Sequence, residues 1–147
     1  MSALMGILSL DGTPVVRERI ERMACAMPEL APDGTDVWVD GPFGCAFQRC
    51  DDMPAPRRGP QPIRDATAGL VVMASGRLDN RDDLERDVAG GDGAAMSDSG
   101  LILEAVRRHG IEVMPQLEGD LDVVVYDTRE RRLYVARSPV DLRSFLW

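Results

Sequence analysis

The sequence predicts an α+β fold in which antiparallel β-sheets are flanked by helices. Three observations lead to it: strand-type segments come first, two amphipathic helices occupy the middle, and a clear hairpin closes the chain. The 147 residues suffice for one domain with a sizeable core, and 44% of them are hydrophobic. Periodicity alone is compatible with several arrangements of this class, a sandwich of two antiparallel sheets among them.

The first strand is expected at Leu4–Leu10, where an apolar stretch ends at an Asp-Gly turn. Thr13 is expected to cap a helix that has Pro14 at its first position, continues to Met27 and is stopped by Pro28. Apolar residues recur in this segment at helical spacing and predict one buried face, made of Val16, Ile20, Met23, Ala24 and Met27.

A hairpin and a buried strand are expected in the next part of the chain. Asp36–Asp40 and Phe43–Gln48 have strand-type patterns and are joined by Gly41-Pro42, a turn signal. Residues 51–62 hold four prolines and several charges, so they predict a loop. Gly69–Ser75 is continuously apolar, which is typical of a buried strand.

Two helices and a second hairpin complete the expected order of elements. Asn80 is expected to cap the first helix, and Gly90–Gly93 to form a flexible turn after it. Ser97 or Asp98 should open the second helix, and Gly110 should end it. The inward face of that helix is predicted to be Leu101, Ile102, Ala105 and Val106. The closing hairpin is predicted at Asp120–Tyr126 and Arg132–Arg137.

Composition excludes several classes of partner. A net charge of −8, from 25 acids and 17 bases, argues against nucleic acid. No apolar run reaches the roughly 18 residues that span a bilayer, and no secretory signal opens the chain, so no membrane partner is expected. Cys25, Cys45 and Cys50 are odd in number and lack zinc-ligand spacing; we expect free thiols in a reducing cytoplasm and no metal site. Arg57-Arg58 is expected to be a solvated pair, with contact to a partner domain as the alternative.

The chain opens MSALMGILSLDG. This resembles the MCGIFGI start of class II glutamine amidotransferase domains, such as that of asparagine synthetase. In that family removal of Met1 exposes an N-terminal Cys, which is the nucleophile and uses its own α-amino group as the base. Here Ser2 stands at the position of that Cys, while Gly6 and Ile7 remain in register.

The similarity continues along the chain. ELAPDG (29–34) resembles the family's HRGPDG, SGRLDNRDDL (75–84) resembles NGEIYNHREL, and MSDSGLILEAVRRHG (96–110) resembles GSDTEVILALYEEYG. Residues 116–143 are similar to LDGMFAFALYDEERGRLFLARDPLGIR. The resemblance implies an N-terminal-nucleophile hydrolase-like αββα sandwich, with two antiparallel sheets flanked by helices. Residues 1–147 would form one glutamine amidotransferase type 2-like domain.

The same resemblance implies where a site would lie. In the family, an Asn side chain and the next Gly amide form the oxyanion hole, and a Glu and an Asp bind the substrate ammonium. AFQR (46–49) resembles the strand that carries the family's substrate-binding Arg. Carried over position by position, the implied site comprises Ser2 at the nucleophile position, Ser75 and Gly76 at the oxyanion hole, and Arg49, Arg77 and Asp98 around the substrate.

The departures from the family pattern fall on the chemistry. Serine lacks the low pKa of a thiol, and the Ser75 hydroxyl is shorter than an Asn amide. Arg77 reverses the charge of the family's Glu and is expected to pair with Asp98; Arg49 either clamps substrate or pairs with a nearby acid. These changes predict a catalytically silent glutaminase-like domain. Two alternatives stay open: an active amidohydrolase that uses Ser2, and a stand-alone module that binds an amino acid or peptide.

The resemblance also implies a partner. In the family the domain precedes an ATP-dependent synthetase and supplies it with ammonia. Members that form an intramolecular amide need no ammonia, and the Cys is commonly lost from β-lactam synthetases and lasso-peptide cyclases. We therefore expect a synthetase or cyclase domain in cis or in trans, specifically a lasso-peptide macrolactam cyclase, and a peptide or small-molecule intermediate as a further ligand. No cofactor is expected in this chain, because ATP and Mg²⁺ belong to the synthetase. The apolar end at residues 145–147 suggests a truncated or naturally split chain that meets this partner.

Overall fold

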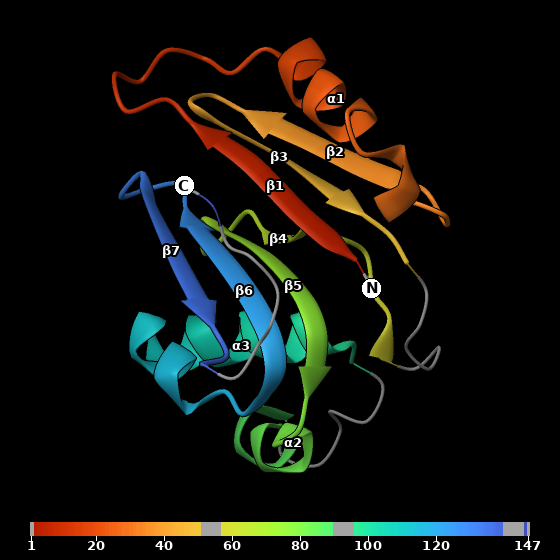
Figure 1. Cartoon of the computed structure of the whole chain (residues 1–147). Coiled ribbons are helices and arrows are strands. Elements are labelled where there is room, and N and C mark those ends of the chain that lie inside the picture. Colours follow the sequence, from red (N-terminus) through yellow and green to blue (C-terminus); the bar gives the residue numbers. More distant parts are fainter. Residues whose placement is uncertain (1, 51–56, 90–95, 140–145, 147) are drawn as a thin grey trace.

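Two antiparallel β-sheets are stacked between helices in the computed structural model (Figure 1), which describes residues 2–50, 57–89, 96–139 and 146. The first sheet has three strands in the order β1-β3-β2, and the second has four in the order β4-β5-β6-β7. Helix α1 lies over the first sheet, and helices α2 and α3 lie over the second (Figure 1). The expected αββα sandwich is therefore confirmed.

The three-stranded sheet is built around its central strand. Its strands are β1 (Ala3–Leu8), β2 (Thr35–Asp40) and β3 (Phe43–Gln48). Every residue of β3 is buried, as expected for a strand paired on both edges and covered on both faces. Helix α1 (Arg17–Cys25) covers the outer face of the sheet, and its Ile20 and Ala24 pack with Val15 and Ala46. The expected hairpin between β2 and β3 is confirmed.

The four-stranded sheet carries the larger helical layer. Its strands are β4 (Ile63–Asp65), β5 (Leu70–Leu78), β6 (Gly119–Asp127) and β7 (Arg132–Arg137). Helices α2 (Arg81–Ala89) and α3 (Asp98–His109) pack on its outer face, and short 3-10 helices lie at Pro28–Leu30 and Ile111–Gln116. The predicted inward face of α3 is confirmed, because Leu101, Ile102, Ala105 and Val106 are all buried. Ser97 caps this helix by accepting a hydrogen bond from the Gly100 amide, at 3.2 Å.

A separate core fills the space between the two sheets. Its buried members are Phe43, Cys45, Val71, Met73, Val124 and Tyr126. The rings of Phe43 and Tyr126 stack across the interface, with their centroids 4.3 Å apart. Because β3 and β5 both contribute to this core, it fixes the ends of these strands relative to one another. The candidate functional site lies at the ends of these two strands.

The start of α1 differs from the prediction. The helix begins at Arg17, and Val16 precedes it in an extended conformation without a side-chain cap, so Thr13 and Pro14 lie outside the helix. Tertiary contact explains the difference. Val15 is buried, its amide donates to the Gly41 carbonyl at 2.8 Å, and a Cβ added to Gly44 would lie 2.8 Å from its side chain. These contacts hold Val15 against the sheet, so the helix begins only at Arg17.

Three further differences concern the second sheet. The short strand β4 was not predicted, and β5 runs on past Ser75 to Leu78, so that the Ser75–Arg77 segment belongs to a strand. The side chain of Asn80 donates to the Gln116 carbonyl and accepts from the Glu118 amide, so it ties α2 to the loop before β6. The expected turn at 90–93 and the first part of the 51–62 loop lie outside the described residues.

Candidate functional site

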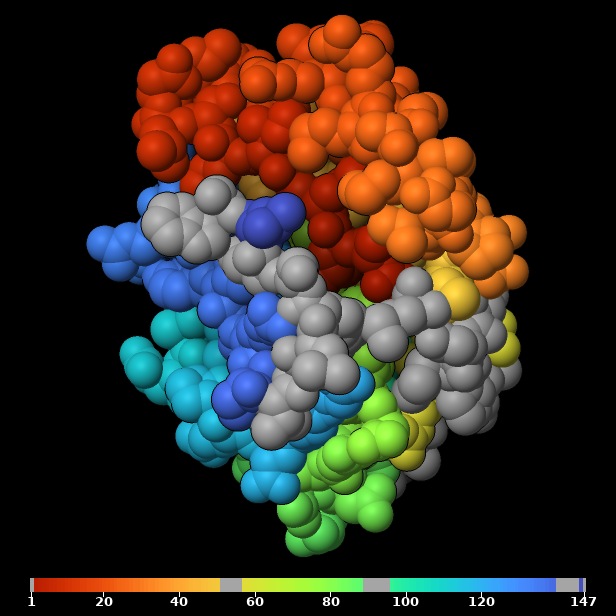
Figure 2. Space-filling view, viewed as in Figure 1, coloured from red at the N-terminus to blue at the C-terminus, as the bar shows by residue number. Residues whose placement is uncertain are grey.

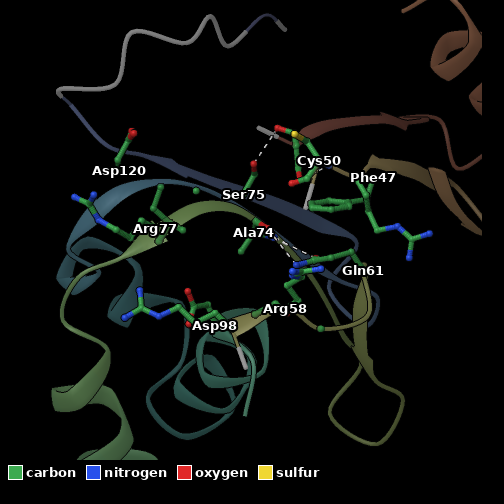
Figure 3. Close-up of a pocket in the computed structure, with 16 residues that line it drawn as sticks. Phe47, Cys50, Arg58, Gln61, Ala74, Ser75, Arg77, Asp98 and Asp120 are labelled. Atoms are coloured by element: carbon green, nitrogen blue, oxygen red, sulfur yellow. Dashed lines mark hydrogen bonds between the residues drawn. The ribbon is translucent and has the colours of Figure 1, made fainter. Parts of the chain in front are cut away.

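A cavity of about 230 Å³ opens at the end of the sandwich where the N-terminus meets β3, β5 and the start of α3 (Figure 3). The structure brings all six predicted site residues to its wall: Ser2, Arg49, Ser75, Gly76, Arg77 and Asp98. These residues come from four separate segments of the chain. Their meeting is what the resemblance implied, and their contacts decide what each can do.

Ser2 is held by the backbone of Cys50. Its hydroxyl donates to the Cys50 carbonyl at 3.3 Å and accepts from the Cys50 amide at 3.1 Å. A hydroxyl has one hydrogen to donate. In this geometry that hydrogen points to a carbonyl and not to a base, so the side chain ties the start of β1 to the end of β3. General-base activation of Ser2 would require this bond to break.

Ser75 is also committed to an internal bond. It is buried, and its hydroxyl donates to the Ser2 carbonyl at 2.9 Å; Figure 3 shows this bond as a dashed line. Because the single hydroxyl hydrogen is used there, Ser75 in this rotamer offers no donor to an oxyanion. Gly76 follows with φ of +109°, a conformation that L side chains rarely adopt. The side-chain half of a family-type oxyanion hole is therefore occupied.

Asp98 forms a buried ion pair with Arg81 of α2. Each side chain is only 9% exposed, and the guanidinium also contacts Glu85 at 2.6 Å and donates to the Met96 carbonyl. Burial raises the pKa of Asp98 above its ordinary value, and the hydrogen bond from Arg81 opposes that rise. The guanidinium thus supplies from within the protein the positive charge that a substrate ammonium would bring.

The expected ion pair between Arg77 and Asp98 is wrong. Arg77 instead pairs with Asp79 at 2.5 Å, on the exposed end of β5. The two residues are two apart at the end of the strand, which places their side chains on the same side. The guanidinium of Arg49 lies 3.5 Å from Asp36, so the expectation that Arg49 pairs with a nearby acid is confirmed. Both ion pairs are solvent-exposed, and exposed ion pairs contribute little to the stability of a protein.

Comparison with known proteins agrees with this geometry. The family model of the glutamine amidotransferase domain matches residues 1–147. The chain belongs to this family. Among asparagine synthetases described as glutamine-hydrolyzing, it is 25% identical to one from Lotus japonicus over 145 residues and 25% identical to one from Brassica oleracea over 145 residues. It is 24% identical over 143 residues to the asparagine synthetase of Asparagus officinalis.

These matches extend over almost the whole chain but only part of each relative. The Lotus japonicus and Brassica oleracea matches cover 98% of this chain and 25% of the relative, and the Asparagus officinalis match covers 97% and 24%. The chain therefore spans about a quarter of the length of the curated relatives it matches. It is a class II glutamine amidotransferase domain of the asparagine synthetase family.

Sequence reasoning missed several residues of this amidotransferase domain's site. Arg57 and Arg58, expected to be solvated, line the cavity, and Figure 3 shows Arg58 beside Gln61. Gln61 holds their loop against β5 by two bonds to the Ala74 backbone, at 3.1 and 3.3 Å. Arg81 was also missed, although a signal was present: it stands at the position of the His in the family segment NHREL.

The cysteines of the domain differ in their chemistry. All three are free, with Cys25 exposed, Cys45 buried and Cys50 on the cavity wall. Burial raises the pKa of the Cys45 thiol to about 12, so it is a poor nucleophile at neutral pH. Among the residues described, no group of three or more His, Cys, Asp or Glu side chains could hold a metal ion. No described helix is long and apolar enough to cross a membrane.

Proposed function

We propose that this amidotransferase domain is catalytically silent. In this proposal it serves as a structural and docking domain for the synthetase part of an ATP-dependent, amide-forming enzyme. The observation that carries the proposal is the hydrogen-bonded pair at the nucleophile position. The Ser2 hydroxyl is bonded to the backbone of Cys50, and the Ser75 hydroxyl is bonded to the backbone of Ser2. The two hydroxyl groups at positions that would face the substrate in a glutaminase are here bonded to the protein backbone.

The chemistry of glutamine hydrolysis supports the same conclusion. A serine hydroxyl has no accessible anionic form near pH 7, whereas a thiol titrates near pH 8.5, so serine depends entirely on a base. Loss of one oxyanion donor lowers the rate by about 10²–10³. The ammonium of glutamine would also have to displace Arg81 from Asp98, a pair whose members are 9% exposed. Three separate requirements of the reaction are thus weakened together.

An exposed apolar strip supports the docking role. Leu133 and Val135 of β7 stand opposite Tyr126 and Val124, which belong to the core between the sheets. They share the face of that core, yet they are 38% and 41% exposed. Among the described strands, β1 pairs with β3 alone; its atoms appear in dark red in Figure 2. Exposed apolar strips of this kind mark interaction sites.

The proposed parent enzyme makes an intramolecular amide, and a lasso-peptide macrolactam cyclase is the specific candidate. An enzyme whose substrate carries its own amine needs no ammonia, so a glutaminase-like domain attached to it can lose its nucleophile and still fold. The synthetase part would bind ATP and Mg²⁺, and a peptide or small-molecule intermediate would be its substrate. We place this enzyme in the cytoplasm, where Cys25 and Cys50 would stay reduced.

The direct test is turnover of glutamine by the purified protein. We expect no steady release of glutamate above a boiled control, and no difference between the native protein and Ser2→Ala. Steady turnover that disappears in Ser2→Ala would reject silence and establish an amidohydrolase that uses Ser2. Intact mass must accompany the assay, because only removal of Met1 exposes the Ser2 amine as a base.

The docking role is tested separately, by co-purification with the synthetase part of the same enzyme. Leu133→Asp and Val135→Asp should each reduce the amount recovered. Val16→Asp is the matched control, because Val16 is also exposed and apolar but lies before α1, over the other sheet. Equal recovery of all three variants would show that the strip on β7 is not the docking surface.

A further inference from the structure

The cavity wall is rich in guanidinium groups. Four arginines from three segments line it, namely Arg49 after β3, Arg57 and Arg58 in the loop before β4, and Arg77 in β5. Among the described residues, two acids share the wall with them, Asp98 and Asp120. This excess of positive charge contrasts with the chain as a whole, whose net charge is −8. Such a local reversal of charge points to an anionic ligand.

Asp98 does not offset this positive charge for a ligand. Its carboxylate is paired with Arg81, a buried residue that is 8% exposed and is not among the residues that line the cavity. A ligand that carries an ammonium group would find its acidic partner already occupied. It would also have to enter beside arginines of the same charge, which disfavours binding. This arrangement disfavours the binding of zwitterionic amino acids.

The arginines of the wall retain capacity to bind. Arg49 and Arg77 each form an ion pair with an exposed carboxylate, and such exposed ion pairs are weak enough for another anion to compete for the guanidinium. The Nε atom of Arg49 is buried and has no hydrogen-bond partner among the residues described. Arg57 lies close enough to Asp79 and Asp98 to interact electrostatically with both carboxylates, and no ion pair holds it within the described part of the chain. Guanidinium groups bind carboxylates through two parallel hydrogen bonds.

We propose that this cavity binds a small carboxylic acid that carries no ammonium group, and that the Arg81–Asp98 pair sets this preference. The proposal rests on the proposed function, since it takes the cavity to be free of glutamine turnover. The volume of about 230 Å³ suits a small free acid. A carboxylate at the end of a peptide has the same chemistry, and the experiment below distinguishes the two sources.

The test compares ligands that differ at one group. Glutarate and glutamate have the same two carboxylates, but only glutamate has an ammonium; glutamine retains the ammonium and has one carboxylate. By titration calorimetry at low salt, glutarate should bind on the order of tenfold more tightly than glutamate or glutamine. An acetylated peptide with a C-terminal carboxylate forms a further arm: binding as tight as that of glutarate would assign the site to peptide-borne carboxylates. Equal or tighter binding of glutamine, or no saturable binding of either carboxylate source, would overturn the proposal.

Two variants connect the affinity to the named residues. Arg57→Gln removes an arginine of the wall and should weaken glutarate binding on the order of tenfold, as expected for loss of a charge-assisted bond. Arg19→Gln is the matched control, because Arg19 lies on the exposed face of α1 and should leave the affinity unchanged. An equal effect of both variants would reduce the site to a general charge effect and refute it. A glutaminase assay run in parallel reports on the proposed function independently of these affinities.

Discussion

Restoring the nucleophile alone should not restore glutaminase activity to this domain. The variant Ser2→Cys supplies a thiol at the position where the family has its Cys, and removal of Met1 would expose the amine that serves as the base. The remaining obstacles are the Ser75 hydroxyl, bonded to the Ser2 carbonyl at 2.9 Å, and Asp98, paired with Arg81. Neither obstacle depends on which atom stands at the tip of residue 2.

The size of the remaining defect follows from these two contacts. A missing oxyanion donor costs about 10²–10³ in rate. A hydrogen bond to a charged group contributes about 1.5–3 kcal/mol, so loss of the ammonium contact costs roughly another 10- to 10²-fold. Taken as independent, the two defects leave Ser2→Cys about 10³–10⁵-fold below a glutaminase with an intact site.

The assay measures glutamate release by enzyme-coupled detection. Intact mass confirms the removal of Met1. The second variant combines Ser2→Cys with Ser75→Asn, and the third adds Arg81→His, the residue of the family segment at that position. Activity should rise by about 10²–10³ at the first of these additions. Ser2→Cys with turnover close to that of a glutamine-hydrolyzing asparagine synthetase would refute the reasoning, because it would show that Ser75 and Arg81 do not limit the site.

Two predictions concern stability and reactivity. Arg81→Gln leaves the Asp98 charge buried without its partner, so it should lower the free energy of unfolding by about 3–5 kcal/mol at pH 7. The pKa of Asp98 is raised in the folded state, so folding takes up a proton at pH values above the unfolded pKa of about 3.9. The loss of unfolding free energy in Arg81→Gln should therefore shrink as the pH falls towards 4. Equal losses in denaturant titrations at two pH values would contradict this. Cys25 is exposed whereas Cys45 has a pKa of about 12, so iodoacetamide at pH 8 should label Cys25 in the folded protein and Cys45 only after unfolding, as peptide mass mapping would show; labelling of both at the same rate would contradict the burial of Cys45.

The strands were predictable because their signals are local. The hairpin of β2 and β3 follows from alternation around a Gly-Pro turn, and the closing hairpin follows from the same pattern. The start of α1 was not predictable, because the burial of Val15 depends on Gly41 and Gly44, more than twenty residues further along the chain. Local capping preferences at Thr13 and Pro14 were outweighed by that contact.

The candidate site divides in the same way. The positions of Ser2 and Ser75 came from the resemblance, and the structure places their atoms within hydrogen-bonding distance. The partners of the charged residues did not follow from it. Arg77 forms an ion pair with Asp79, two residues away. Asp98 pairs with Arg81, which is seventeen residues away on a packed helix. Choosing between such partners requires the packing of α2 against α3, which periodicity does not define.

The separation of the site from the cores explains how this fold can tolerate substitutions at its candidate site. The three buried clusters consist of apolar side chains on the faces of sheets and helices. Among the described residues, they share only Ala74 and Leu121 with the cavity wall. Substitution at Ser2, Ser75 or Arg77 therefore removes no apolar area from the cores. The polar groups of the site must still be satisfied, since a buried polar group without a partner costs about 1–3 kcal/mol. Ser2, Ser75 and Asp98 each have an internal partner, so the polar groups of the site are satisfied within the protein and stabilise the fold around it.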